Sequence, residues 1–204
     1  MKLYYMPGAC SLASHIVLEW IGASYETQRL SHDQLKTEAY LRVNPLGAVP
    51  ALELDDGTVL TQNTAVLTYL ADAYPEAKLE GEGTPKGRAE VHRWVGLVNS
   101  DIHPAFKPLF GTTAYLGDAA MIEKSKANAR ERLRMLFKLV DDQLRTHDWI
   151  AGRRSIADAY LYVMSRWAHA NALEIEDLDG FERFYQRMND DPAVVRALQA
   201  EELT

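Results

Sequence analysis

The sequence predicts an α/β half followed by an all-helical half. Over the first third of the 204 residues, short strand-like runs alternate with helical patterns, in the order strand–helix–strand and then strand–strand–helix. A stretch rich in Gly, Pro and Glu at residues 75–87 then interrupts the periodicity. Beyond it, apolar residues recur at helical spacing to the end of the chain. We therefore expect a first domain over residues 1–77, a linker over 78–87 and a helical domain over 88–204.

Each element of the first half has its own local signal. Gly22 ends the first helical pattern, Asp55-Asp56-Gly57 forms the turn of a hairpin, and Pro75 ends the last helix. The predicted elements are strands at Lys2–Tyr5 and Tyr25–Leu30, helices at Ser11–Ile21 and Glu38–Arg42, a hairpin from Val49–Leu54 to Thr58–Leu60, and a helix after Asn63.

The second half shows helical spacing only. Residues Ile156–Ala170 are apolar on several sides, which predicts a central, buried helix. Ser155-Ile156-Ala157-Asp158 immediately before it reads as an N-capping box. Two further helices are predicted from apolar residues that share a face, one from Val91, Trp94, Val95 and Val98 and the next from Met121, Leu133, Leu136, Phe137, Val140 and Leu144. Two shorter helices are predicted at the end of the chain, at Phe181–Met188 and Pro192–Leu203.

Composition excludes several classes of function. The formal net charge is −7 and no block of Lys or Arg is present, so neither a nucleic acid nor an anionic membrane surface is an expected partner. No apolar stretch approaches the roughly 20 residues that cross a bilayer, and no signal peptide is recognisable. The single cysteine rules out a disulfide framework and favours a cytoplasmic location. The six His residues are scattered and predict no metal site.

Cys10 is the first residue with chemical potential. It follows a predicted strand and opens a predicted helix, where free N–H groups and the helix dipole stabilise a thiolate and lower the pKa of a cysteine. The alternative is a buried, inert cysteine. Because no second cysteine is present, any partner thiol comes from outside the chain.

Two further segments have both a functional and a structural interpretation. Val49-Pro50 begins a strand, where a cis bond would expose the Val49 backbone to an extended peptide, whereas a trans proline simply marks an edge strand. Gln62-Asn63 opens a helix, where side-chain amides and free N–H groups suit a carboxylate and an amino group. Plain N-capping is the alternative there.

Taken together, these motifs resemble those of beta-class bacterial glutathione transferases. The similarity covers nearly the whole chain in the right order. It rests on five segments: Pro7–Leu18, Asn44–Leu52, Leu60–Asp72, His103–Phe110 and Ser155–Tyr160. The resemblance implies a thioredoxin-like N-terminal domain, an all-helical C-terminal domain and a homodimer.

The resemblance also implies the roles of particular residues toward glutathione, the expected co-substrate. Cys10 and His103 would face its sulfur, and the Val49 backbone, with Pro50 cis, would pair with its cysteinyl part. Gln62 and Asn63 would hold its γ-glutamyl group. Lys36 would contact its glycyl carboxylate.

The chain departs from the family pattern at two places. Gln62-Asn63 stands where the family usually has Glu followed by Ser or Ala, which removes a charge from the γ-glutamyl site. Pro104 replaces the basic residue that often follows the histidine, and it removes a helical hydrogen bond. The alternative to an active-site role for His103 is that it only satisfies the backbone carbonyl groups that Pro104 frees.

Two functions follow from this reading. The first is an enzyme that conjugates glutathione to an apolar electrophile, or exchanges thiols and disulfides through Cys10. The second is a non-catalytic binding protein with the same fold, which carries ligands or binds a protein partner.

Overall fold

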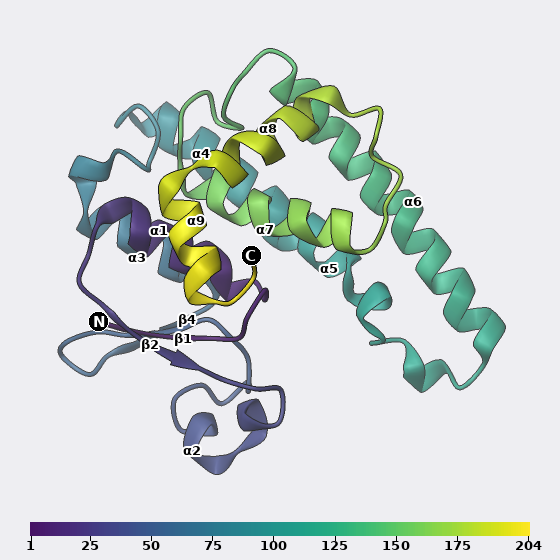
Figure 1. Ribbon diagram of the computed structural model, residues 1–204, viewed down its shortest axis with the longest axis horizontal. Helices are drawn as coiled ribbons and strands as arrows, with labels where there is room; N and C mark the ends of the chain where they lie inside the picture. The colour runs from purple at the N-terminus through teal and green to yellow at the C-terminus, as the bar shows by residue number, and fades with distance from the viewer.

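The computed structural model describes residues 1–204 and contains both predicted halves (Figure 1). The first half is a four-stranded mixed sheet of order β2-β1-β3-β4, in which β1 pairs parallel with β2 and antiparallel with β3, and β3 pairs antiparallel with β4. Helices α1 and α3 lie on one side of it and α2 lies on the other (Figure 1). The bounds are β1 Lys2–Tyr5, α1 Ser11–Ile21, β2 Glu26–Arg29, α2 Glu38–Leu41, β3 Ala51–Glu53, β4 Val59–Thr61 and α3 Asn63–Ala73.

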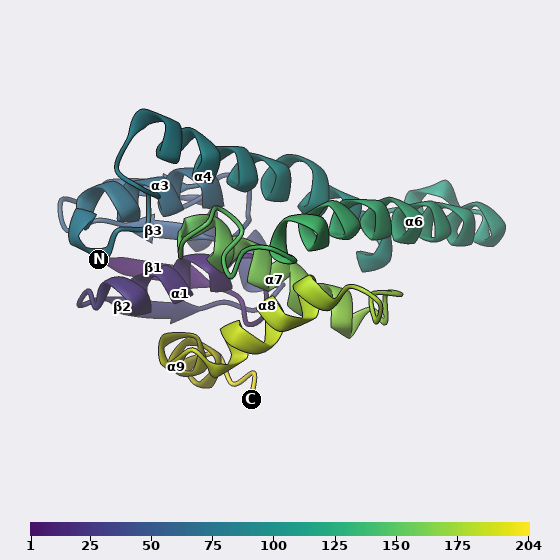
Figure 2. The same ribbon diagram turned by 90° about the horizontal axis from the view of Figure 1, so that it is seen from above.

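The second half is helical throughout, as predicted. Helix α6 is the longest and extends away from the other helices (Figure 2). Short 3-10 turns lie at Gln34–Lys36, Pro75–Ala77, Lys107–Phe110 and Ala114–Leu116. The remaining bounds are α4 Pro85–Leu97, a π-helical turn Val98–Ile102, α5 His103–Ala105, α6 Ala119–Leu144, α7 Ile156–Ala170, α8 Asp179–Asp190 and α9 Pro192–Ala200.

One continuous apolar core of 43 buried residues joins the two halves. Helix α7 is central to it, since it packs against α1, α3, α4 and α8. Helix α9, at the end of the chain, returns to pack on α1 (Figure 2). The second half is therefore in contact with the helix that carries Cys10 at its start.

The structure differs from the expectations in a few places. Helix α4 begins at Pro85, so the last three residues of the predicted linker are helical. The strand predicted over Val49–Leu54 is limited to Ala51–Glu53. Met121, assigned to the buried face of its helix, is 55% exposed because it lies in the first turn of α6, outside the buried segment. None of the helices combines the length and apolarity needed to cross a membrane.

Candidate functional site

A cavity of about 430 Å³ lies between the two halves at the start of α1. Cys10 and the loop before it form one wall, and the segment that precedes β3 forms a second. The second half supplies the remaining wall. The lining residues are Met6, Pro7, Gly8, Ala9, Cys10, Leu35, Gly47, Ala48, Val49, His103, Lys107, Phe110 and Trp167.

Cys10 is half-buried and its thiol donates a hydrogen bond to the Val49 carbonyl oxygen at 3.3 Å. Burial raises the pKa of this thiol to about 12, although the backbone N–H groups of Cys10 and Ser11 act in the opposite direction. The predicted lowering of the cysteine pKa is therefore wrong for the unliganded protein. The desolvation caused by tertiary packing outweighs the contribution of the helix N-terminus.

The Val49–Pro50 bond is cis. The Val49 carbonyl accepts from Cys10, and the Val49 backbone N–H has no partner in the protein, because the ladder of β3 begins only at Ala51. A free N–H beside a carbonyl is the arrangement with which an extended peptide pairs as an added strand. This edge faces the cavity and lies directly beside Cys10.

The start of α3 differs from what the sequence implied. The Asn63 amide is buried and donates to the Cys10 carbonyl at 2.7 Å, while its oxygen accepts from Ser14 at 2.8 Å. Its side chain therefore already has partners within the fold, and its role toward a ligand remains a prediction. Gln62, by contrast, is exposed, lies at φ 72° and makes no side-chain hydrogen bond. The first backbone N–H groups of α3 lack helical partners, as at any helix start.

His103 lines the cavity opposite Cys10 and is held by a partner that the sequence did not reveal. Its Nδ1 lies 2.7 Å from the hydroxyl of Tyr160, which in turn lies 3.2 Å from the Asn99 side-chain oxygen. The His103 ring also packs edge-on against Trp167. Desolvation and, to a lesser extent, the charge of Lys107 together lower the pKa of His103 to about 4, so the imidazole is neutral near pH 7. With Nδ1 occupied, Nε2 is the nitrogen left for a ligand.

The loop before Cys10 is fixed by the second half. The Trp167 indole N–H donates to the Gly8 carbonyl at 2.8 Å, and the Gly8 N–H donates to the Glu201 carboxylate at 2.9 Å. Glu201 is fully buried and also bonds His15 of α1 at 2.9 Å. Residues near the end of the chain thus hold the turn that presents Cys10.

Comparison with known proteins finds matches to both halves of the chain. The family model described as "Glutathione S-transferase, N-terminal domain" matches residues 8–73, and that described as "Glutathione S-transferase, C-terminal domain" matches residues 100–192. A glutathione S-transferase of Xanthomonas campestris pv. campestris is 49% identical over the full length of both chains. The chain belongs to the glutathione S-transferase family.

Solved structures agree with this membership. A glutathione S-transferase from Xylella fastidiosa is 51% identical, has a TM-score of 0.97 and covers 100% of this chain and 99% of its own. A sphingomonad glutathione S-transferase, solved in complex with glutathione, is 38% identical with a TM-score of 0.88, and the match covers 100% of both chains. The family predicted from sequence motifs is confirmed.

Among the residues for which the resemblance implied a contact with glutathione, Cys10, Val49 and His103 line the same cavity. Pro50 follows Val49 and is buried. Lys36 is exposed in the turn beside Leu35, without an ion-pair partner. Gln62 lies outside the lining, at the start of α3.

Sequence reasoning missed the roles of Tyr160, Trp167 and Lys107 in the site. Tyr160 looked like a core aromatic, and it is indeed buried, but its hydroxyl reaches His103. Lys107 belongs to a recognised motif, yet nothing in its spacing indicated that it would line the cavity.

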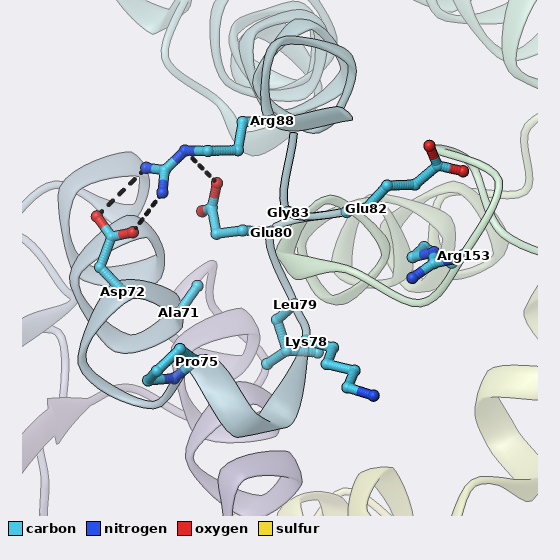
Figure 3. Close-up of a pocket in the computed structure, with 11 residues that line it drawn as sticks. Ala71, Asp72, Pro75, Lys78, Leu79, Glu80, Glu82, Gly83, Arg88 and Arg153 are labelled. Carbon is cyan, nitrogen blue, oxygen red and sulfur yellow. Dashed lines mark hydrogen bonds and ion pairs between the residues drawn. The ribbon is translucent and has the colours of Figure 1, made fainter. Parts of the chain in front are cut away.

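A larger cavity of about 580 Å³ lies at the linker and shares no residue with the site. There Arg88 bridges Asp72 and Glu80, with nitrogen–oxygen distances of 2.8 and 3.6 Å (Figure 3). The lining of this larger cavity is largely polar and contains no cysteine, and its acidic and basic side chains neutralise one another. The smaller cavity, which contains Cys10, is therefore the candidate functional site. No cluster of three metal-binding side chains occurs in the structure.

Proposed function

We propose that this protein conjugates glutathione to an electrophilic carbon atom in the Cys10 cavity. The observation that carries the proposal is the free backbone N–H of Val49, beside a carbonyl that contacts the Cys10 thiol, in the cavity that His103 also lines. This backbone edge suits the cysteinyl residue of a bound peptide, and it directs the peptide's thiol toward Cys10 and the first turn of α1.

The remaining parts of glutathione have candidate partners on either side of Val49. The free Gln62 amide and the open N–H groups at the start of α3 suit the γ-glutamyl group. The unpaired Lys36 suits the glycyl carboxylate. Asn63 contributes its backbone N–H and positions Cys10 through its amide.

The reaction needs a thiolate near neutral pH. The thiol of glutathione donates a hydrogen bond to His103 Nε2, the ring nitrogen without a hydrogen, and loses its proton to water; the resulting thiolate is stabilised by the Cys10 thiol and by N–H groups at the start of α1. It then attacks the electrophilic carbon, a carbon–sulfur bond forms, and the leaving group departs with the electron pair of its bond. The protein supplies a lowered thiol pKa and alignment of the reactants.

The high pKa of the Cys10 thiol makes it a hydrogen-bond donor rather than a nucleophile. In disulfide exchange, a Cys10 thiolate would attack a glutathione mixed disulfide and release the other thiol. We expect Cys10→Ala to retain conjugation of 1-chloro-2,4-dinitrobenzene within about tenfold, since it removes one donor among several. Retained conjugation with lost reduction of a glutathione mixed disulfide would assign Cys10 to disulfide exchange, and a complete loss of conjugation would contradict its role as one donor among several.

Glutathione binding and turnover test the proposal together. Gln62→Ala should raise the Kd for glutathione about threefold to tenfold, because one exposed hydrogen-bonding group is lost. Gln199→Ala is the matched control, since Gln199 is exposed on α9 and its side chain has no partner. Tight glutathione binding without turnover of any electrophile or mixed disulfide would favour the non-catalytic binding protein. Absence of binding at millimolar glutathione would contradict both.

The homodimer, the cytoplasmic location, a role in detoxification and the domain limits at residues 77 and 88 remain proposals. The family resemblance supports the first three, and the loss of periodicity at the linker supports the last. Sedimentation equilibrium of the purified chain tests the dimer directly, because a mass equal to that of one chain contradicts it.

A further inference from the structure

The cavity beside Cys10 contains a single fully charged side chain. Of its 13 lining residues none is Asp or Glu, and Lys107 is the only Lys or Arg. Lys107 has no ion-pair partner, and its charge depresses the pKa of the neutral His103. In a chain of net charge −7, an uncompensated cation at the mouth of an otherwise apolar cavity is a local feature of this site.

The position of Lys107 on its turn places it next to an aromatic ring. Lys107–Phe110 forms a 3-10 turn, in which side chains three residues apart lie one above the other. The separation along such a turn is about 6 Å, since each residue rises about 2.0 Å. Phe110 is 50% exposed and packs edge-on against Trp167 at 4.9 Å between ring centroids. The Phe110 ring also stacks on Phe106 at 5.9 Å between centroids, so a cation and a half-exposed aromatic ring stand on one turn at the cavity.

We propose that the electrophile accepted by this protein is an aromatic anion, whose ring packs on Phe110 and whose carboxylate or sulfonate pairs with Lys107. This inference rests on the proposed conjugation and specifies its substrate class. Because Lys107 and Phe110 stand on one turn, a ring that bears its acidic group directly can reach both side chains. Lys36, which lies outside the lining beside Leu35, remains for the carboxylate of glutathione.

A matched pair of substrates tests the inference. The anion 4-chloro-3,5-dinitrobenzoate and its methyl ester both lose chloride to a thiolate, and they differ in charge. Each kcat/KM is divided by the rate constant of the uncatalysed reaction with glutathione, which removes the difference in intrinsic reactivity. Wild type should prefer the anion on this scale, and the preference should fall as salt is raised.

Substitutions at Lys107 assign the preference to its charge. Lys107→Gln should lower the preference for the anion about threefold to tenfold, the range of an exposed to partly buried charge pair. Lys107→Arg should retain most of it. Lys124→Gln is the control, because Lys124 is exposed and unpaired on α6 and its loss changes the net charge equally.

Each result either supports the inference or overturns it. An unchanged preference in Lys107→Gln, or a wild type that prefers the ester, overturns it. An equal loss for both substrates with a raised KM for glutathione also overturns it, since Lys107 would then bind glutathione. If wild type converts neither substrate, the proposed conjugation fails separately. Calorimetry with 3,5-dinitrobenzoate and S-methylglutathione then decides the anion site, and equal affinities of wild type and Lys107→Gln overturn it.

Discussion

Asp158 connects the start of the central helix α7 to the loop before it, and the cost of its removal follows from its bonds. The buried carboxylate accepts from the backbone N–H of Ile150 at 2.9 Å, from that of Ser155 at 2.8 Å and from the Ser155 hydroxyl at 2.9 Å. Asp158→Ala leaves two buried N–H groups without an acceptor. Each costs about 1–3 kcal/mol, so the free energy of unfolding should fall by about 2–6 kcal/mol.

Ser155→Ala provides the comparison, because it removes a hydroxyl and leaves both backbone bonds to Asp158 intact. It should cost about 0.5–2 kcal/mol, the range for an N-cap side chain. Asp158→Asn keeps an acceptor oxygen and should fall between the two. Urea unfolding followed by circular dichroism, at one protein concentration, measures all three. A loss for Asp158→Ala no larger than that for Ser155→Ala would refute the assignment of the cost to the orphaned N–H groups.

Four further predictions concern the site. Iodoacetamide should alkylate unliganded Cys10 slowly near pH 7, since its pKa is about 12, and a rate like that of free glutathione contradicts this. The pKa of His103 is about 4 in the folded protein and about 6.5 in the unfolded chain, so the pH profile of kcat/KM should show no fall near pH 6.5. The unfolded chain binds more protons between pH 6.5 and 4, so this group should make the protein less stable as the pH falls through that range. The same two profiles measured for His103→Gln check both expectations. Tyr160→Phe should lower kcat/KM about tenfold by freeing His103 Nδ1, with little change in glutathione Kd. Glu201→Ala should lower the unfolding free energy by about 2–5 kcal/mol, measured in urea.

Local signals were sufficient to predict most of the fold. The limits of α1 and α7 follow from apolar periodicity together with a terminating glycine at Gly22 and the capping box at Ser155. The strand at Val49 was predicted too long, because the alternation of apolar residues does not reveal where ladder bonds begin. Met121 was misplaced for a similar reason, since periodicity identifies a helix face but not how far a neighbour covers it.

The site was predicted in its position more accurately than in its chemistry. Cys10 and Val49 are placed by local structure, and the family resemblance added His103. The raised pKa of Cys10 could not be predicted, because it results from burial in the folded protein by residues distant in sequence. The contact between Tyr160 and His103 spans 57 residues, and no spacing rule connects them.

The second half therefore does more than close one side of the cavity. Trp167 and Glu201 hold the carbonyl and the N–H of Gly8, two residues before Cys10, and Tyr160 holds His103 opposite the thiol. These side chains come from α7 and from the end of α9, which also pack on α1. Because the same helices bury the core and fix the groups around the sulfur, a substitution that loosens their packing alters the position of Cys10 before it unfolds the sheet. Reactivity at Cys10 is for this reason a sensitive measure of how well the two halves are packed.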